Sequence, residues 1–432
     1  MKIIFLIILT IGSLMGTVLP KYYTKTLSNG LEVVAIPLNK GSNVISTDIF
    51  YKVGSRNEVM GKTGIAHMLE HMNFKSTKEL KAGEFDKIVK GYGGVNNAST
   101  GFDYTHYFIK SSSKNMSESM RLFAELMANL KLKDEEFQPE RDVVAEERRW
   151  RTDNSPIGYL YFRMFNNAYI YHPYHWTPIG FMNDILNWSI DDIKEFHKTY
   201  YQPNNAILMV TGDIDPKEVF KQAQKRFGKI KNHNKVPKVK FVEPKQDGQK
   251  RVVLHKDTQV ELLAITFHIP DFRSPDQVAL SVISEILYSG KSSRLYKNLI
   301  DKKQLVNQIY AYNMENLDPG LFIFLAVCNP GVKAEVVEEE LKKEIEKLKN
   351  EYVTQEELDK VKINTKSDFI YSLESSSSVA NLYGSYLVRG DIEPLLKYEE
   401  RVNSITKETI KEVANKYFDY SKSTTVILKN NK

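Results

Sequence analysis

The sequence predicts an α+β protein made of two homologous domains, in each of which helices pack against a mostly antiparallel sheet. Three observations support this prediction. The chain has 432 residues, which exceeds the size at which a single hydrophobic core usually stops growing. In its first half, strands with alternating apolar residues and amphipathic helices follow one another. The second half then repeats the same succession of elements, which indicates an internal duplication of unusually long period.

The first half begins with a predicted hairpin at 24–38, where Ser28, Asn29 and Gly30 form the turn between two strand patterns. The spacing of apolar residues predicts the elements that follow. Strands are expected at 44–55, 96–100, 105–112 and 205–215, and helices at 64–73, 79–90, 117–130, 134–153 and 216–230.

A stretch rich in Lys and Pro, residues 229–250, separates the two halves. Because it has few large apolar residues, a solvated linker is favoured over a basic binding strip. Beyond it, the predicted helix at 276–288 corresponds to the helix at 64–73 but contains no histidine. The predicted division is a first domain at 21–230, a linker at 231–250 and a second domain at 251–432.

The composition is that of an ordinary globular protein, with 42% apolar and 26% charged residues. The 60 basic and 54 acidic residues are mixed along the chain and give a net charge of +6. No Arg-rich block or recognisable nucleic-acid motif accompanies this mild excess of positive charge. The sequence therefore predicts no nucleic-acid partner.

The N-terminal segment, residues 1–20, has the pattern of a secretory signal. It starts with Lys2, continues as a largely apolar run from Ile3 to Leu19 and ends at Pro20. Polar and small residues dilute the run, which makes it a weak candidate for a membrane span. The small-residue cleavage signal is poor, so an uncleaved anchor in the inner membrane stays open. We expect an exported, periplasmic protein that contacts the membrane only if this segment is uncleaved.

The chain contains one cysteine, Cys328, which excludes an internal disulfide. It lies in the apolar run FLAVCNPG, which is typical of a buried strand. A structural role is therefore expected rather than a role as a nucleophile.

Residues 64–77, GIAHMLEHMNFKST, carry the most informative pattern in the chain. On a helix, His67 and His71 lie one turn apart on the same face and can bind one metal ion. Glu70 lies beside that face, where it can act as a base on a metal-bound water. The alternative is an amphipathic helix that carries two imidazoles by chance. The opposite face is apolar and is expected to pack into the domain, through Ile65, Met68, Leu69 and Met72.

Catalytic zinc usually has three protein ligands and keeps one position for water, so a third ligand must come from elsewhere. The predicted helix QPERDVVAEERRW offers Glu140, Glu146 and Glu147. Glu140 and Glu147 are seven residues apart and share a face, whereas Glu146 points away from it. Charged helices commonly carry glutamates as solvated surface, so spacing alone leaves the ligand open. The residues by themselves indicate a zinc hydrolase without identifying its third ligand.

The H-x-x-E-H order resembles the inverzincin metallopeptidases, which include pitrilysin, insulin-degrading enzyme and the mitochondrial processing peptidases. HMLEHMNFKST is similar to the family segment H-F-L-E-H-M-x-F-K-G-T, with Ser76 where Gly is usual. GGVNNASTGFDYTHY, ERDVVAEERRW, HPYHWTPIG and YYQPNNAILMVTGDID resemble further family segments. The resemblance covers residues 22–425 and includes the duplication. It implies a processing-peptidase-like duplicated fold of the short, two-domain bacterial type.

The resemblance implies that His67, His71 and Glu147 bind one Zn²⁺ per chain and that Glu70 is the general base. The ligand Glu147 is the last Glu of E-R-x-x-V-x-x-E, and Glu140, the first, is implied to be a supporting acid close to the metal. Glu146 has no role in the family pattern. The first domain is thus the catalytic, zinc-binding one, and the second is metal-free.

The resemblance also gives Asn97 and Ala98, in NNAST, a role in substrate binding at a sheet edge, where an extended peptide can add as a strand. The alternative is an ordinary polar strand end. His106, His172 and His175 are expected to be structural. The segment SSRLY at 292–296 contains an Arg and a Tyr of the kinds that bind substrate in the family, but packing at a helix start is favoured for it.

The function predicted is that of a zinc-dependent endopeptidase that hydrolyses peptides or unfolded segments. One alternative is a non-catalytic subunit of the same fold, whose sign would be a damaged motif. The other is a module that clasps peptides without cutting them. The expected partners are a peptide substrate and a second chain, either as a homodimer or as a heterodimer with a metal-less homologous subunit.

Overall fold

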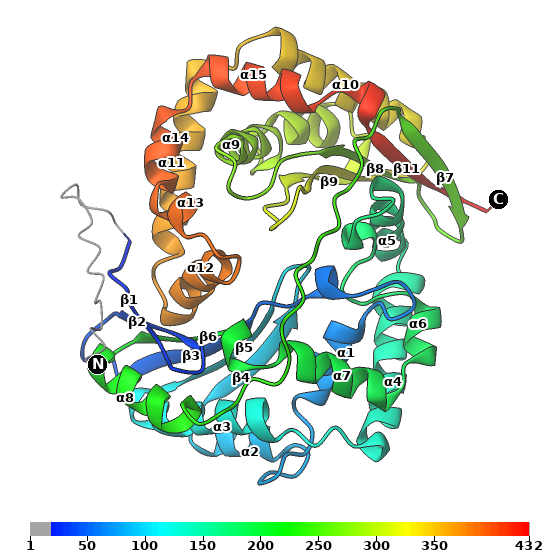
Figure 1. Cartoon of the computed structure of the whole chain (residues 1–432). Coiled ribbons are helices and arrows are strands. Elements are labelled where there is room, and N and C mark those ends of the chain that lie inside the picture. Colours follow the sequence, from blue (N-terminus) through cyan, green and yellow to red (C-terminus); the bar gives the residue numbers. More distant parts are fainter. Residues whose placement is uncertain (1–18, 432) are drawn as a thin grey trace.

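The computed structural model of the chain describes residues 19–431 and contains two sheets (Figure 1). The strands of the first sheet, in spatial order, are β1 (Tyr23–Thr26), β2 (Glu32–Pro37), β6 (Ala206–Gly212), β3 (Val44–Tyr51), β5 (Thr105–Ser112) and β4 (Val95–Thr100). Those of the second are β7 (Lys250–Lys256), β11 (Thr424–Asn430), β8 (Leu262–His268), β10 (Leu321–Cys328) and β9 (Val306–Asn313).

The two sheets have the same topology once β1 is set aside. In the described part of the chain, β2 and β6 pair in parallel in the first sheet, as do β7 and β11 in the second. The other neighbours are antiparallel. The predicted α+β fold, with two duplicated and mostly antiparallel sheets, is therefore confirmed. We call residues 19–227 the first unit and residues 250–431 the second unit.

The helices of the first unit are α1 (Ile65–Met72), α2 (Glu84–Gly91), α3 (Met116–Asn129), α4 (Asp134–Arg148), α5 (Pro156–Ala168), α6 (Met182–Asn187), α7 (Ile190–Tyr200) and α8 (Pro216–Phe227). Those of the second are α9 (Asp276–Tyr288), α10 (Ala334–Asn350), α11 (Gln355–Tyr371), α12 (Ser376–Val388), α13 (Glu393–Leu396), α14 (Tyr398–Ser404) and α15 (Lys407–Tyr417). Several begin at caps that the sequence supplies, such as the reciprocal pair of Ser189 and Asp192 at the start of α7 and that of Thr354 and Glu357 at the start of α11.

One helix of each unit packs on the sheet of the other unit (Figure 1). Helix α5 of the first unit packs on the second sheet, where Phe165 and Ile323 belong to one buried cluster. Helix α12 of the second unit packs on the first sheet, where Tyr383, Phe50 and Met209 belong to another. Burying one large apolar side chain contributes about 1.5–3 kcal/mol, so the exchange ties the two units together strongly. The sequence patterns did not predict this exchange.

The contact between α12 and the first sheet is closest at Gly384. A Cβ at this position would overlap the ring of Phe50. Gly384→Ala is therefore expected to lower the free energy of unfolding by about 1–3 kcal/mol, because overpacking forces the helix away from the sheet. Urea unfolding measures the change. Asn381→Ala, at an exposed position of the same helix, is the control; equal stability of both variants would contradict this packing.

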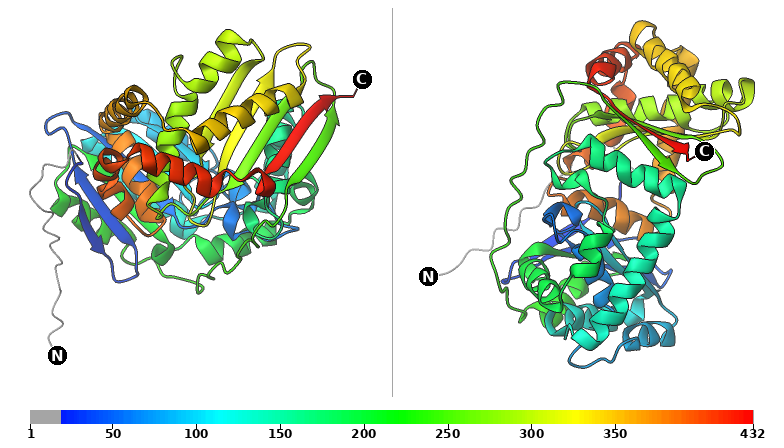
Figure 2. Two further views of the ribbon diagram at one scale, coloured as in Figure 1. Left: turned by 90° about the horizontal axis from the view of Figure 1, so that it is seen from above. Right: turned by 90° about the vertical axis from the view of Figure 1, so that its right-hand side faces the viewer.

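The segment between Phe227 and Lys250 has no helix or strand and is largely exposed, and it runs along the molecule from one unit to the other (Figure 2). It is anchored through Glu243, whose carboxylate accepts the backbone N–H groups of Ile170, Tyr171 and His172 at 2.8, 3.0 and 2.8 Å. This is the segment for which a solvated linker was predicted.

The predicted export signal lies almost wholly outside the described residues. Within residues 19–431, no helix has both the length and the apolarity needed to cross a membrane. Cys328 is fully buried at the end of β10, and burial raises the pKa of its thiol to about 12. A thiol held protonated in this way is a poor nucleophile, in agreement with the expected structural role.

Candidate metal centre

Helix α1 presents its polar face because its apolar face is locked into the first unit. The four residues predicted to pack inward, Ile65, Met68, Leu69 and Met72, are buried, and so is Ala66. The helix starts at Gly64, which has a φ of +85°, and a Cβ there would lie 2.6 Å from the carbonyl oxygen of Ile179. A glycine is therefore required at the start of the helix. The polar residues His67, Glu70 and His71 remain on the half-buried side.

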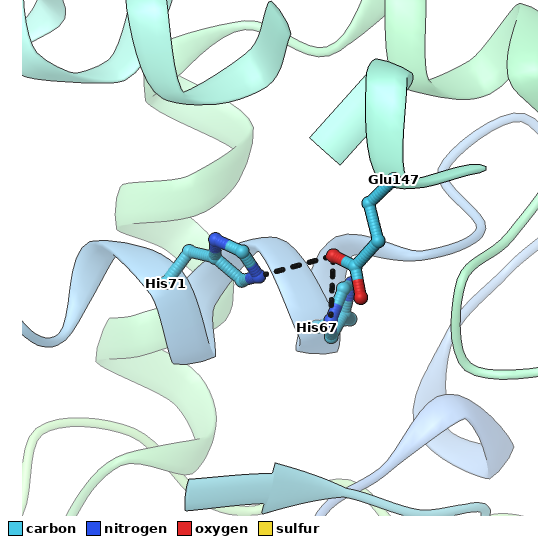
Figure 3. Close-up of side chains that lie close together, drawn as sticks. All are labelled: His67, His71 and Glu147. Carbon is cyan, nitrogen blue, oxygen red and sulfur yellow. Dashed lines mark ion pairs between the residues drawn. The ribbon is translucent and has the colours of Figure 1, made fainter. Parts of the chain in front are cut away.

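The two imidazoles face the carboxylate of Glu147, which comes from α4 (Figure 3). Oε2 of Glu147 lies 3.6 Å from Nε2 of His67 and 3.4 Å from Nε2 of His71. Ligand atoms of these three residues all lie within 4.8 Å of one another. Two ligands of a tetrahedral zinc ion are about 3.4 Å apart, so the three residues fit this metal. Within residues 19–431 they form the only such group of three or more His, Cys, Asp and Glu.

The two histidines differ in their electrostatics. Burial, together with the neighbouring His71, lowers the pKa of His67 to about 4. Burial also acts to lower the pKa of His71, but hydrogen bonds to Glu140 and Glu147 outweigh it and raise this pKa to about 9. Burial opposes ionisation of Glu147, yet the two imidazoles and Arg151 hold its pKa below the usual range. His67 is therefore neutral and Glu147 ionised, as zinc ligation requires, whereas the imidazole of His71 would release a proton when a metal binds.

Two charged side chains orient the predicted ligands from outside. Nδ1 of His71 lies 2.8 Å from Oε1 of Glu140, whose other oxygen pairs with Lys75. Oε1 of Glu147 is held by Arg151 at 2.9 Å, which directs Oε2 to the imidazoles. The structure thus places Glu140 against a ligand and outside the donor group. By contrast, Nδ1 of His67 is buried without a hydrogen-bond partner in the described part of the chain.

Glu70 lies on the same helix beside this group and is partly buried. Its Oε2 accepts a hydrogen bond of 2.5 Å from Oγ1 of Thr100, the last residue of β4. Burial raises the pKa of Glu70, although Thr100 and His71 act to lower it. A carboxylate with a raised pKa is a stronger base than a solvated one.

Asn97 and Ala98 lie on β4, which is the edge strand of the first sheet. They pair with Phe108 and Tyr107 of β5. Asn97 is exposed, whereas Ala98 is half-buried against the core. Because Thr100 joins the same strand to Glu70, this sheet edge lies directly beside α1.

The remaining candidate residues lie elsewhere. Glu146 points away from the metal centre, with 72% of its side chain exposed, and pairs with Arg149. Arg294 of SSRLY makes a two-point contact with Glu357 at 2.7 and 2.8 Å. The three structural histidines have local partners: His106 with Asp48, His172 with Asp318, and His175 with the carbonyl of Tyr169.

One important residue was missed from the sequence, the buried Glu58. Its carboxylate accepts N–H groups of Gly64 and Ala66 at the start of α1, and Nε1 of Trp176, each at 2.8 Å. Burial raises the pKa of Glu58 to about 8 against the effect of these three donors. The oxygens of Glu58 accept the first N–H groups of α1, which have no partner within the helix, and so fix α1 in place. Trp176 lies in the HPYHWTPIG segment, which was recognised without a role.

Glu58→Gln is expected to lower the free energy of unfolding by about 1–3 kcal/mol, because the amide cannot satisfy all three buried donors. Chemical denaturation measures this loss. Glu195→Gln, at an exposed position of α7, is expected to stay within about 0.5 kcal/mol of the parent. If both substitutions leave stability unchanged, Glu58 does not anchor the helix.

Comparison with known proteins adds to this geometry. The family model described as "Insulinase (Peptidase family M16)" matches residues 33–169, and that described as "Peptidase M16 inactive domain" matches residues 187–365. A "Zinc protease PqqE" of Helicobacter pylori is 55% identical over 428 residues, which cover 98% of this chain and 96% of the relative.

Solved structures are also similar to the chain. The crystal structure of a protease from Helicobacter pylori has a TM-score of 0.94 at 56% sequence identity. The match covers 95% of this chain and 100% of the chain in that structure. The structure of a peptidase M16 inactive domain from Pseudomonas fluorescens has a TM-score of 0.85 at 18% identity, with 95% and 98% coverage. The second likeness concerns the fold alone.

Proposed function

Because the chain belongs to the insulinase family of peptidases, peptidase family M16, we propose that it is a zinc-dependent endopeptidase acting on peptides or unfolded segments. Membership of this family is what the H-x-x-E-H stretch predicted. The observation that carries the proposal is the donor group of His67, His71 and Glu147 with the carboxylate of Glu70 beside it. All four residues lie in the segment that matches the peptidase model, whereas the inactive-domain model matches a segment without them.

In the proposed reaction, zinc held by His67, His71 and Glu147 would polarise the scissile carbonyl and make a water molecule more acidic. Glu70 takes the proton of the attacking water and then delivers it to the departing amine. Oε2 of Glu70 accepts the hydrogen bond of Thr100, so Oε1 is the oxygen that we expect to take the proton from water. The raised pKa of Glu70 suits both halves of this transfer.

Outer contacts keep the ligands in position. With zinc bound, His71 would keep its proton on Nδ1 and donate it to Glu140, which would leave the lone pair of Nε2 for ligation. Arg151 holds one oxygen of Glu147 and leaves the other for ligation. We assign Glu140 and Arg151 to positioning and not to proton transfer.

The edge of β4 is the proposed substrate-binding element. A peptide that adds to this edge as a further strand is held through main-chain hydrogen bonds, which place no demand on its sequence. One of the adjacent residues Asn97 and Ala98 would supply such main-chain groups, because successive residues of a strand direct them to opposite sides. The peptide would then pass beside α1, where Glu70 is held by Thr100. This arrangement suits unfolded segments as substrates.

Export to the periplasm and pairing with a second chain, identical or metal-less, complete the proposal. The export prediction comes from the apolar N-terminal segment, and the pairing prediction from the resemblance to short two-domain members of the family. The intact set of ligands argues against a purely non-catalytic subunit.

The proposal is tested with an unstructured peptide blocked at both ends, so that only internal bonds can be cleaved. Zinc-loaded protein is expected to yield internal fragments by mass spectrometry, and a chelator is expected to stop their formation. Zinc-loaded protein that binds the blocked peptide and leaves it intact would instead be a peptide-clasping module.

A further inference from the structure

The second unit contains a cavity of about 370 Å³, bordered by α9, β9, α11 and α12, which we call the counterpart cavity. Its lining includes three carboxylates, those of Glu285, Glu315 and Asp368, and no basic side chain. Aromatic rings also line it, among them Tyr386 and Tyr398. The volume is within the range of about 300–1,000 Å³ that is usual for ligand pockets.

The counterpart cavity occupies the place in the second unit that the metal centre has in the first. Residues 65–72 of α1 and 279–286 of α9 have the same order of buried and half-buried positions. The half-buried positions are His67, Glu70 and His71 in α1. Ser281, Ser284 and Glu285 are the corresponding residues of α9, with the same spacing of three and four.

The other elements of the metal centre also have counterparts. Glu147 is the fourteenth residue of α4, and Asp368 is the fourteenth residue of α11. Thr100 ends the edge strand β4, and Asn313, which also lines the cavity, ends the edge strand β9. The duplication has therefore kept the site and replaced the residues that could hold a metal.

The carboxylates of the counterpart cavity lack a balancing charge in its lining. Oε2 of Glu285 is buried and has no hydrogen-bond partner in the described part of the chain. Burial, reinforced by Glu315, Glu285 and Asp368, raises the pKa of Tyr398, so all three carboxylates act on this ring. The nearby Arg389 is engaged with the carbonyl of Glu315 and lies outside the lining. Of the other two carboxylates, Glu315 accepts the hydroxyl of Tyr386 at 3.1 Å and Asp368 is exposed. The unpaired buried oxygen is therefore that of Glu285, and a buried negative charge without a partner is costly and favours a positively charged ligand.

We propose that the counterpart cavity binds a basic side chain, lysine or arginine, of the peptide that the enzyme hydrolyses. This inference rests on the proposed function. The ring of Tyr398 adds cation–π attraction for an ammonium or guanidinium group, whereas the ring of Tyr386 already contacts the guanidinium of Arg389 at 4.9 Å. A guanidinium or ammonium carries several donors that can reach separate carboxylates. A metal ion fits less well, because in residues 19–431 only the His67 group meets the spacing for one.

Binding is measured by fluorescence anisotropy in the zinc-loaded Glu70→Gln background, where no hydrolysis intervenes. The probes are two labelled peptides that differ only in one lysine replaced by glutamine. The lysine peptide is expected to bind about tenfold more tightly, and Glu285→Gln with Asp368→Asn is expected to remove this preference. Glu146→Gln, on the exposed face of α4, is the control that keeps the preference.

A second variant tests whether a loss of the preference comes from misfolding of the double variant or from the change in charge. Thr365→Lys places a tethered ammonium in the cavity one helical turn from Asp368, and it is also expected to remove the preference while circular dichroism stays unchanged. The inference is overturned if the parent binds both peptides equally, or if both variants keep the preference. Failure of the zinc-loaded wild type to cut either peptide would instead reject the peptidase proposal, since the binding assay does not depend on hydrolysis.

Discussion

Glu70→Gln is expected to abolish peptide hydrolysis while the purified protein keeps about one zinc per chain. The amide has the shape of the carboxylate and can still accept the hydrogen bond of Thr100, but it cannot take a proton from water. Loss of a general base lowers the rate by about 10²–10⁴-fold. The value of kcat/KM for a quenched, unstructured oligopeptide measures this loss, with zinc quantified in the same preparation.

Glu146→Gln is the matched control for this experiment, because it makes the same chemical change on an exposed side chain that pairs with Arg149. It should leave both turnover and zinc content unchanged. Retained turnover in zinc-loaded Glu70→Gln would reject Glu70 as the base.

Glu147→Gln is expected to weaken zinc binding by more than about 100-fold, since even the loss of an outer partner of a ligand costs about 10–100-fold. A neutral amide removes the one anionic donor that faces both imidazoles (Figure 3). Competition with a chromogenic chelator measures the affinity without reference to activity.

The neighbouring Glu146→Gln should leave the zinc affinity within about twofold of the parent, because its side chain is 72% exposed. The two substitutions are at neighbouring positions, yet the zinc affinities expected for the two variants differ by about two orders of magnitude. Weakened binding in Glu146→Gln alone would mean that the neighbouring glutamate is the ligand.

The helix and strands that build the metal centre could be predicted from the sequence because each is marked by the spacing of apolar residues within a short segment. The apolar spacing in GIAHMLEHMNF predicts both α1 and the face on which His67 and His71 lie. The alternating pattern of β3, the strand-like segment of β5 and the apolar run of β6 likewise predict strands of the first sheet. Glu147 is a different case, since helical spacing left three glutamates open and only the family pattern selected one of them.

The features that escaped prediction depend on contacts between distant parts of the chain. The carboxylate of Glu58 binds Trp176, which is 118 residues away, and no local pattern marks such a partner. The exchange of α5 and α12 depends on which sheet face each helix reaches, and apolar spacing alone does not determine that. In α9 the sequence indicated only that the histidines are missing, whereas Glu285 and Asp368 come together only in the folded chain.

The central claim is that zinc on His67, His71 and Glu147 and the carboxylate of Glu70 form one hydrolytic centre. Its most direct test is to titrate zinc into metal-free protein while hydrolysis of the quenched oligopeptide is followed. The account predicts a rate that rises in proportion to bound zinc and levels off at one zinc per chain, with Glu70→Gln binding the same zinc without turnover. Turnover in the absence of zinc, or a filled site in the wild type without any turnover, would contradict it.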